Sequence, residues 1–517
     1  MAQREKSEGR DIPHGVRRFI AAVLLLGLVI GAGTVTLNMN SSYPAPVPLR
    51  ADGLLGNHPG SFARIPPQDA SGASYLPASN VLRLSDGRLR YLPADSSEPV
   101  TVSPDDPGAL AVTDETRKWL EQGNVPGKNS MERQVSERAL LDLRLLTPEG
   151  AATLAGPDRR WAYVWPRDAS FAAAAFAATN HHEESYQILS FLARTQQSDG
   201  TWEARYRPDG SPVADGRAPQ LDSTGWVPWA AWYSFVTDPK HERAEKHMRM
   251  LWPSVRAAAD AASDSLGPGG LPPGGSDYWE MPTLGPNLGT AAPMRTGLRS
   301  AADIATKLGH ENDAQRYARA AARLDMAIED EFAPRGYPRT ARLGSGADAA
   351  VNFLAPPFAS RGAQVEKAVE DAASRLAAPN GGMLPGEQWK QDPSVSWTPE
   401  TAFFALSASA DGRDATARRY LTWLADHRTS LGSFPEKIDG DGKPQAAAPL
   451  AWTSAIVILA LAAKENPLPV PPVYKTAGEP GPSPSPLAPL GGVLLGVAFL
   501  AAANRPRWYP VSVSVRP

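Results

Sequence analysis

Tryptophans and carboxylates alternate in several short stretches of this 517-residue chain. The first stretch, WAYVWPRDASF at residues 161–171, brings two Trp residues up to an adjacent Arg167 and Asp168. Aromatic rings stack on the apolar C–H faces of a pyranose, and charged side chains can grip its hydroxyls in pairs. We therefore expect Trp165, Arg167 and Asp168 to bind a sugar. Capping of the following helix by Asp168 is the structural alternative.

Two further stretches add polar side chains in loops. PQLDSTGW places Gln220 and Asp222 just before a predicted helix, where Asp222 is also a good N-cap. GGLPPGGSDYWEMP carries Asp277, Trp279 and Glu280, and the proline two positions later keeps Glu280 out of a regular helix. A carboxyl partly buried beside an aromatic ring has a raised pKa, as a proton donor to a glycosidic oxygen requires. An ordinary solvated glutamate is the alternative.

A second carboxylate follows near the C-terminal end of the helical region. GSFPEKIDGDGKPQAAAPLAWTSA puts Glu436 in a loop after Phe434-Pro435. A carboxylate that activates water completes the pair needed for glycoside hydrolysis. Glu387, in a Pro-Gly loop near two Trp residues, is the rival for the role of base.

Helical periodicity dominates residues 126–466, which we predict to form one all-α domain. The predicted helices lie near residues 130–147, 168–180, 183–197, 223–236, 240–265, 289–309, 312–331, 346–354, 362–376, 398–411, 413–428 and 449–464. A helix, a long loop and a second helix then repeat: LSFLARTQQSDGTW from Leu189 aligns with LTWLADHRTSLGSF from Leu421, and D-G-x-P turns follow at the same offset. Such units suit a toroid of six αα-hairpins whose loops converge on one pocket.

These motifs carry a family resemblance. YVWPRDASF, QLDSTGW, SDYWE and FPEKIDGDG followed by PLAWTSA resemble, in this order, glycoside hydrolase family 15, the glucoamylase-like enzymes with an (α/α)6 domain. The resemblance implies an inverting exo-acting α-glucosidase that releases glucose from non-reducing ends, with Glu280 as general acid and Glu436 as general base. It also implies that Trp165, Arg167, Asp168 and Trp279 hold the terminal glucose. A trehalase of the same family is one alternative. A carbohydrate-binding or scaffold protein with an impaired site is another, because Met281-Pro282 departs from the family pattern.

Composition excludes several other classes. The net charge of −3 gives no basic surface for nucleic acid, and the absence of cysteine excludes disulfides and thiolate metal sites. The consecutive histidines at 181–182 point to different sides of a helix, so we expect no metal site there. No phosphate-binding or dinucleotide-binding glycine motif occurs, so we expect no cofactor. The sequence makes no prediction of an oligomeric state.

The ends of the chain predict a membrane protein. Residues 19–38 are apolar and follow Arg17 and Arg18, and their number is close to the ~20 that a membrane-spanning helix needs. A signal peptide is the alternative. A second apolar run covers residues 487–504 and precedes Arg505 and Arg507. We therefore expect cytoplasmic tails at 1–18 and 505–517, a Pro-rich linker at 467–486, and an extracytoplasmic lead-in at 40–125 with one β-hairpin at Asp86-Gly87.

Overall fold

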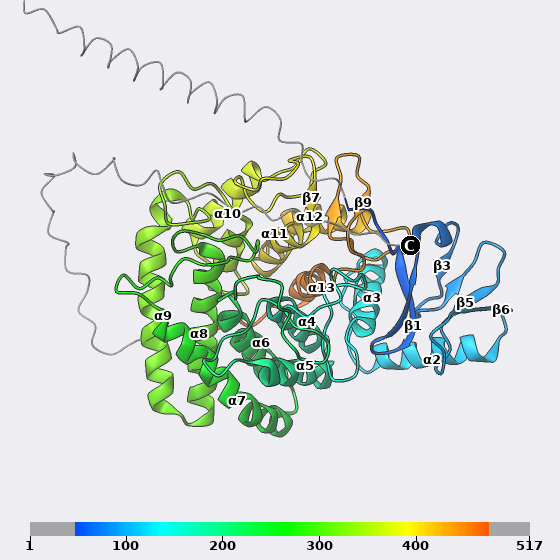
Figure 1. Ribbon diagram of the computed structural model, residues 1–517, viewed down its shortest axis with the longest axis horizontal. Coiled ribbons are helices and arrows are strands. Elements are labelled where there is room, and N and C mark those ends of the chain that lie inside the picture. Colours follow the sequence, from blue (N-terminus) through cyan, green and yellow to red (C-terminus); the bar gives the residue numbers. More distant parts are fainter. Residues whose placement is uncertain (1–46, 475–517) are drawn as a thin grey trace, which may run out of the picture. The chain divides into compact units, whose positions relative to one another are not determined.

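Helices that are apolar on nearly every side form the centre of the fold (Figure 1). They are α4 (Pro166–Ala178), α6 (Ser223–Thr237), α8 (Leu288–Leu308), α11 (Thr398–Ala410) and α13 (Ala451–Glu465), completed by the short 3-10 helix η3 (Ala349–Leu354). Each contacts the next in the order α4, α6, α8, η3, α11 and α13, and α13 packs against α4 to close the ring. A helix that is apolar all round has to be buried, and here the second layer of helices buries it.

Amphipathic helices make that second layer. They are α3 (Ser130–Leu145), α5 (His182–Thr195), α7 (His241–Asp264), α9 (Glu311–Glu331), α10 (Ala363–Arg375) and α12 (Asp414–Asp426). In α9, for example, Tyr317, Leu324 and Ile328 are buried against the ring, while the opposite side of the helix is charged and exposed. Inner and outer helices alternate along the chain, so the domain is the toroid of six hairpins that the sequence predicts.

The computed structural model describes residues 47–474. The predicted membrane segments at 19–38 and 487–504, both predicted tails and most of the Pro-rich linker lie outside these residues. Within residues 47–474, no helix is both long and apolar enough to cross a bilayer.

The helix predicted at 346–354 differs from the others, because it is a single 3-10 segment. Pro356 and Pro357 follow it closely, and the residue before a proline is pushed out of the α conformation, so the segment cannot lengthen. The fold also contains more strand than an all-α domain, since three small sheets lie within the described residues.

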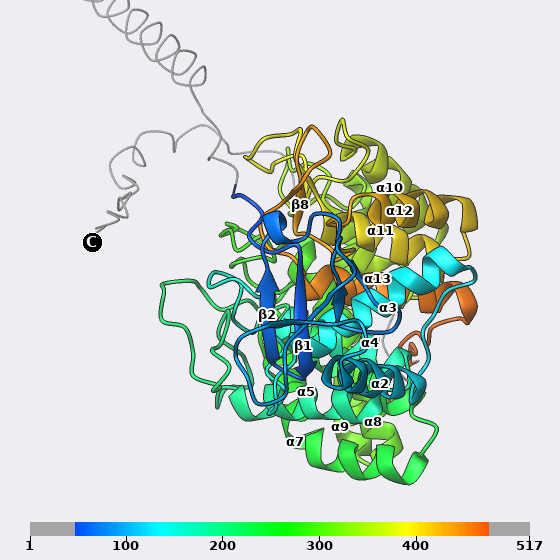
Figure 2. The ribbon, with the colours of Figure 1, turned by 90° about the vertical axis from the view of Figure 1, so that its right-hand side faces the viewer.

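The segment before residue 126 corrects our expectation of an extended lead-in. The hairpin β1–β2 (Gly53–His58, Ser61–Ile65) precedes a four-stranded antiparallel sheet of β3 (Ser74–Tyr75), β4 (Leu82–Arg83), β5 (Leu89–Tyr91) and β6 (Val100–Val102). The turn at Asp86-Gly87 joins β4 and β5. The 3-10 helix η1 (Pro67–Asp69) and the unpredicted helix α2 (Pro107–Glu121) complete this part, which lies on one side of the toroid (Figure 2). Short strands of two or three residues are too brief for alternation to reveal them.

A third sheet links the loops at one end of the ring. Strands β7 (Ser396–Trp397), β8 (Lys437–Ile438) and β9 (Pro444–Gln445) pair in that order, with Trp397 opposite Lys437. A short 3-10 helix, η2 (Ala333–Arg335), follows α9. The β7–β8 pair fixes the loop that carries Glu436 against the start of α11, where the amide of Thr398 donates to the Glu436 carbonyl at 3.0 Å.

Two inner helices touch at their backbones. A Cβ atom on Gly297 of α8 would lie 2.5 Å from the Cα of Gly225 of α6, and one on Gly225 would lie 2.2 Å from the carbonyl carbon of Pro293. No real Cβ tolerates such a distance, so only glycine permits this crossing.

Replacement of Gly297 by alanine should therefore force α6 and α8 apart. We expect Gly297→Ala to lower the free energy of unfolding by about 1–3 kcal/mol, measured by denaturant titration. Gly362→Ala is the matched control, because no heavy atom lies within 4 Å of its added Cβ and its φ of −146° suits any residue. Equal stability of the two variants would contradict the backbone contact.

Candidate active site

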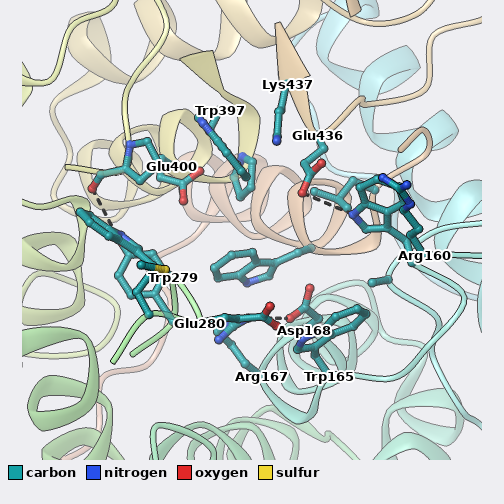
Figure 3. Close-up of a pocket in the computed structure, with 18 of the residues that line it drawn as sticks. Arg160, Trp165, Arg167, Asp168, Trp279, Glu280, Trp397, Glu400, Glu436 and Lys437 are labelled. Atoms are coloured by element: carbon teal, nitrogen blue, oxygen red, sulfur yellow. Dashed lines mark hydrogen bonds and ion pairs between the residues drawn. The ribbon is translucent and has the colours of Figure 1, made fainter. Parts of the chain in front are cut away.

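A cavity of about 500 Å³ opens at the end of the ring where inner helices begin (Figure 3). It lies between the starts of α4, α11 and α13 and the loops that precede the inner helices. Its wall is rich in tryptophan and in charged side chains, namely Arg160, Trp161, Trp165, Arg167, Asp168, Arg217, Trp279, Glu280, Trp389, Trp397, Glu400, Glu436, Lys437 and Trp452. The inner ring fills its own core with apolar side chains, so this end is where its polar groups can gather.

Arg167 is the buried cation of the site. Its Nη1 donates to Gln220 Oε1 at 2.8 Å and to Asp222 Oδ2 at 3.2 Å, and its Cζ lies 4.7 Å from the centroid of the Trp452 ring. Its Nη2 lies 3.4 Å from Asp168 Oδ2. A buried cation is stable only when paired and hydrogen-bonded, and these contacts fix the guanidinium in one orientation.

Asp168 faces the pocket rather than capping its helix. It is the third residue of α4, and no side chain caps that helix. Its Oδ2 has no hydrogen-bond partner within the described residues, although the side chain is buried. Burial raises the pKa of Asp168 to about 6, opposed by Arg167. Apart from the ion pair with Arg167, Asp168 Oδ2 can still accept a hydrogen bond from a ligand hydroxyl.

Glu280 stands on a tight turn that other residues hold in place. Asp277 Oδ1 accepts from the amides of Trp279 at 3.1 Å and Met281 at 3.3 Å, and Asp277 Oδ2 accepts from Arg339 Nε at 2.7 Å. The φ of Glu280 is +60°, a left-handed conformation that side chains adopt at a cost of the order of 1 kcal/mol. Such strain at a carboxyl in a pocket is typical of a functional residue.

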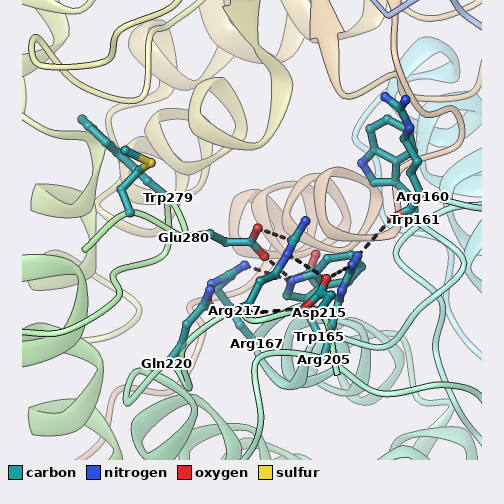
Figure 4. A network of polar contacts seen from close by, with 12 residues as sticks. Arg160, Trp161, Trp165, Arg167, Arg205, Asp215, Arg217, Gln220, Trp279 and Glu280 are labelled. Carbon is teal, nitrogen blue, oxygen red and sulfur yellow. Dashed lines mark hydrogen bonds and ion pairs between the residues drawn. The ribbon is translucent and has the colours of Figure 1, made fainter. Parts of the chain in front are cut away.

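A polar network surrounds the Glu280 carboxyl (Figure 4). Trp165 Nε1 donates to Glu280 Oε1 at 2.6 Å, and the Arg217 guanidinium pairs with Glu280 Oε2. Asp215 holds Arg217 in turn, with Oδ2 3.2 Å from Arg217 Nε, and also pairs with Arg205. Arg217 lies on the exposed side of the carboxyl, so an incoming ligand oxygen would compete with it for Glu280.

Glu436 reaches the pocket from another side, on the loop before β8 (Figure 3). Trp161 Nε1 donates to its Oε1 at 3.3 Å, and its Oε2 is enclosed without a partner in the described chain. Burial raises the pKa of Glu436, while Lys437 opposes the shift. A carboxyl with one free oxygen can accept a proton from a bound water.

The structure brings together most of the residues predicted from the sequence. Trp165, Arg167, Asp168, Trp279, Glu280 and Glu436 all line the cavity. Gln220, Asp222 and Asp277 do not: the first two hold Arg167 and the third holds the Glu280 turn, so they act one layer behind the wall. Asp222 precedes α6 but makes no side-chain cap bond.

Glu387, the rival base, is absent from the lining of the cavity. Arg375 Nε donates to its Oε1 at 2.8 Å, and the amide of Ala347 donates to its Oε2 at 2.7 Å. These contacts hold the Glu387 carboxyl in a structural role between two loops.

Four charged residues of the wall were not found from the sequence, namely Arg160, Arg217, Glu400 and Lys437. Arg160 and Arg217 lie in irregular loops, where no periodicity marks a side chain as inward-facing. Glu400 could have been found from its spacing in the sequence. It follows Trp397 by three positions, just as Asp168 follows Trp165.

Comparison with known proteins identifies the toroid. Residues 144–396 match the family described as Glycosyl hydrolases family 15. This match covers just under half of the chain. The matched residues include Arg167, Asp168 and Glu280, whereas Glu436 lies beyond them. An uncharacterized glycosyl hydrolase of Methanocaldococcus jannaschii is 26% identical over 137 residues, which make up 26% of this chain and 21% of that protein.

Solved structures share the toroidal fold. A bacterial glucoamylase complexed with acarbose has a TM-score of 0.56 at 19% identity, over 70% of this chain and 60% of that one. The glucoamylase from Saccharomycopsis fibuligera has a TM-score of 0.52 at 15% identity, over 66% and 97% of the two chains. This chain therefore spans about 60% of the bacterial glucoamylase and a fifth of the archaeal relative.

Asp348 lies behind the pocket wall and contacts Tyr278, one of the lining residues. Its raised pKa gives a testable pH dependence of stability. Tyr278 donates its hydroxyl to Asp348 Oδ1 at 2.9 Å, and the amide of Ala350 donates to the same oxygen at 2.8 Å. Burial raises the pKa of Asp348 from 3.8 to about 7. Between these two values unfolding releases the proton, so the stabilisation is complete below pH 3.8 and is lost as the pH rises through 7.

We expect the melting temperature of Asp348→Asn, relative to the wild type, to rise between pH 4 and pH 7 and to level off by pH 8, because asparagine keeps the acceptor but cannot ionise. Calorimetric scans at several pH values measure this difference. Asp371→Asn is the control, since that exposed carboxylate pairs with Lys367 on the surface and should give a flat difference. A flat curve for Asp348→Asn would show that its carboxyl is not buried in neutral form.

Proposed function

We propose that this protein is an exo-acting inverting α-glucosidase of the glucoamylase type, which releases glucose from the non-reducing ends of α-glucans. The observation that carries the proposal is the placement of Glu280 and Glu436 on different sides of one tryptophan-lined pocket of a family 15 domain (Figure 3). In an inverting reaction one carboxyl protonates the leaving oxygen, and the other activates a water on the opposite face of the sugar.

The chemistry assigns each carboxyl a role. Glu280, held by Trp165 and Arg217, acts as general acid after it takes up a proton from solvent and the glycosidic oxygen takes the place of Arg217. Glu436, with its free Oε2, acts as general base on water. Proton transfer by positioned side chains of this kind contributes about 10²–10⁴-fold to the rate.

The terminal sugar lies against Trp452 and Trp279 in this proposal. Arg167 and Asp168 hold its hydroxyls, since Asp168 Oδ2 makes no hydrogen bond within the described residues and Arg167 is fixed by its buried partners. Trp279, Trp389 and Trp397 form a continuous aromatic wall, with neighbouring ring centroids 5.0 Å and 5.2 Å apart. This wall suits the apolar faces of further sugar rings.

There are two alternatives to the glucoamylase-type activity. Trehalose is the rival substrate, because enzymes of the same family hydrolyse it. A sugar-binding protein without turnover is the other alternative, motivated by Met281, which lines the pocket, and by the Arg217 ion pair on the proposed acid.

Proton NMR of the products distinguishes these functions. We expect the protein to release β-glucose from maltotetraose and not from trehalose, and we expect Glu280→Gln and Glu436→Gln each to lower the rate by at least about 10²-fold. Glu387→Gln is the matched control and should keep wild-type activity, because its carboxyl binds Arg375 outside the pocket. Release of α-glucose would overturn inversion. Binding of maltotetraose without any release would favour the binding protein.

We also propose that the catalytic domain is extracytoplasmic and tethered to the bilayer by residues 19–38 and 487–504, with both termini cytoplasmic. The apolar runs at both ends and the arginines beside them support this topology. The full chain should therefore sediment with membranes and resist alkaline extraction, whereas a chain restricted to residues 47–474 should stay in the supernatant. A full chain found in the supernatant would contradict the tether.

A further inference from the structure

The internal repeat continues into the pocket. Leu189 and Leu421 lie 232 residues apart, and the same offset relates Trp165 to Trp397 and Asp168 to Glu400. Both tryptophans are N-cap residues of inner helices, and both acids are the third residue of their helix.

Backbone pairing confirms that the two units are structurally equivalent. Val164 bridges Tyr206 in the first unit, and Ser396 pairs with Ile438 in the second, again 232 residues on. A cation covers each tryptophan at the matched position. Arg205 Cζ lies 5.1 Å from the centroid of the Trp165 ring, and Lys437 Nζ lies 4.0 Å from that of Trp397. The pocket therefore has two walls with the same arrangement of backbone and side chains, one from each repeat.

Glu400 belongs to the second wall, and one oxygen of its carboxyl makes no hydrogen bond that would give it a structural role. It is 4% exposed and lines the cavity, and its Oε2 has no hydrogen-bond partner in the described chain. Its carboxyl is approached by its own backbone amide in the first turn of α11, and Trp397, the N-cap residue, makes no side-chain cap bond. Buried polar groups are nearly always hydrogen-bonded, so an unpaired oxygen at a pocket wall indicates a missing ligand.

The charges around Glu400 limit the chemical class of ligand that it can bind. Glu436 and Asp348 are its like-charged neighbours, and the nearby cation Arg167 is already bound to Asp168 and Asp222. Burial raises the pKa of Glu400 to about 8, helped by Glu436 and Asp348. A neutral carboxylic acid both donates and accepts, which matches a sugar hydroxyl better than a cation or an anion.

We propose that Glu400 is a specificity-determining residue that hydrogen-bonds a hydroxyl of the sugar ring held by Arg167 and Asp168, from the opposite wall of the pocket (Figure 3). The inference deepens the proposed function, on which it rests for the identity of the ring as glucose. In this proposal the sugar ring is bound between two acids, Asp168 and Glu400, which occupy equivalent positions in the two repeats. We call this pair of acids the clasp.

Binding of glucose, a ligand that undergoes no hydrolysis, tests the clasp without relying on turnover. We expect Glu400→Leu in the full chain to weaken glucose binding about 5- to 10-fold, the usual worth of one hydrogen bond to a hydroxyl, measured by tryptophan fluorescence. Glu400→Gln, which can still donate and accept, should lose less. Glu370→Gln, on the exposed side of α10, is the matched control and should bind as the wild type does.

A panel of monodeoxy derivatives of glucose identifies the contact. One derivative should bind the wild type about 5- to 10-fold more weakly than glucose but bind Glu400→Leu as well as glucose does, because both partners of the bond are then gone. The melting temperature of Glu400→Leu should equal or exceed that of the wild type, since the substitution removes an unpaired buried polar group.

Three results would overturn the inference: unchanged glucose affinity in Glu400→Leu, an equal response of both proteins to every deoxy derivative, or a marked fall in melting temperature for both Glu400 variants. Glucose binding with the expected pattern but without hydrolysis of any α-glucoside would leave the clasp standing and reject the proposed enzyme. Absence of glucose binding by the wild type would reject both.

Discussion

A closed ring of helices that are buried on nearly every side can hold a polar group along its length only when that group is paired, so an open polar pocket has to lie at an end of the ring. In this protein the constraint is severe, because α4 and α13 are almost entirely alanine and large apolar residues and pack directly against their neighbours. The buried charges elsewhere in the ring, such as Arg295, Arg299 and Asp303 of α8, are paired with neighbouring side chains, whereas the polar groups of the pocket lie where inner helices begin. Helix N-termini leave amides unpaired and favour negative charge, which suits a site built largely from carboxyls.

The buried charges are balanced by nearest-neighbour pairing. Arg167 is held by two side chains behind the wall, and Arg339 pairs with Asp277 while lying 3.6 Å from the centroid of the Trp279 ring. These contacts fix the positions of the groups that face the cavity. Three carboxyls with an oxygen that makes no hydrogen bond within the described residues, those of Asp168, Glu400 and Glu436, line the same cavity. Unpaired atoms also remain behind the wall, on Gln220, Asp222 and Asp348, but these three residues do not line the cavity.

Much of this organisation was predictable from the sequence, because helical periodicity extends over whole elements. Each predicted helix from 130–147 to 449–464 has a counterpart, and the tryptophan and carboxylate motifs marked most of the pocket wall. Of the strands before residue 107, only the β4–β5 hairpin at Asp86-Gly87 was predicted; the others are six residues long at most. The supporting roles of Gln220, Asp222 and Asp277 escaped it as well. Whether a carboxyl faces the cavity or lies one layer behind depends on side-chain direction, which a motif does not specify.

The N-terminal hairpin has a consequence for how the chain folds. The amide of Leu431 donates to Asp52 Oδ2 at 3.0 Å, and Thr429 Oγ1 donates to the Asp52 carbonyl at 2.5 Å, so residues nearly 380 positions apart are joined. The ring itself closes only when α13 meets α4. During synthesis the first inner helices must therefore wait, with their apolar faces uncovered, until almost the whole domain has left the ribosome. Long-range closure of this kind slows folding and exposes intermediates to aggregation, so the domain acquires its structure late, and as a unit.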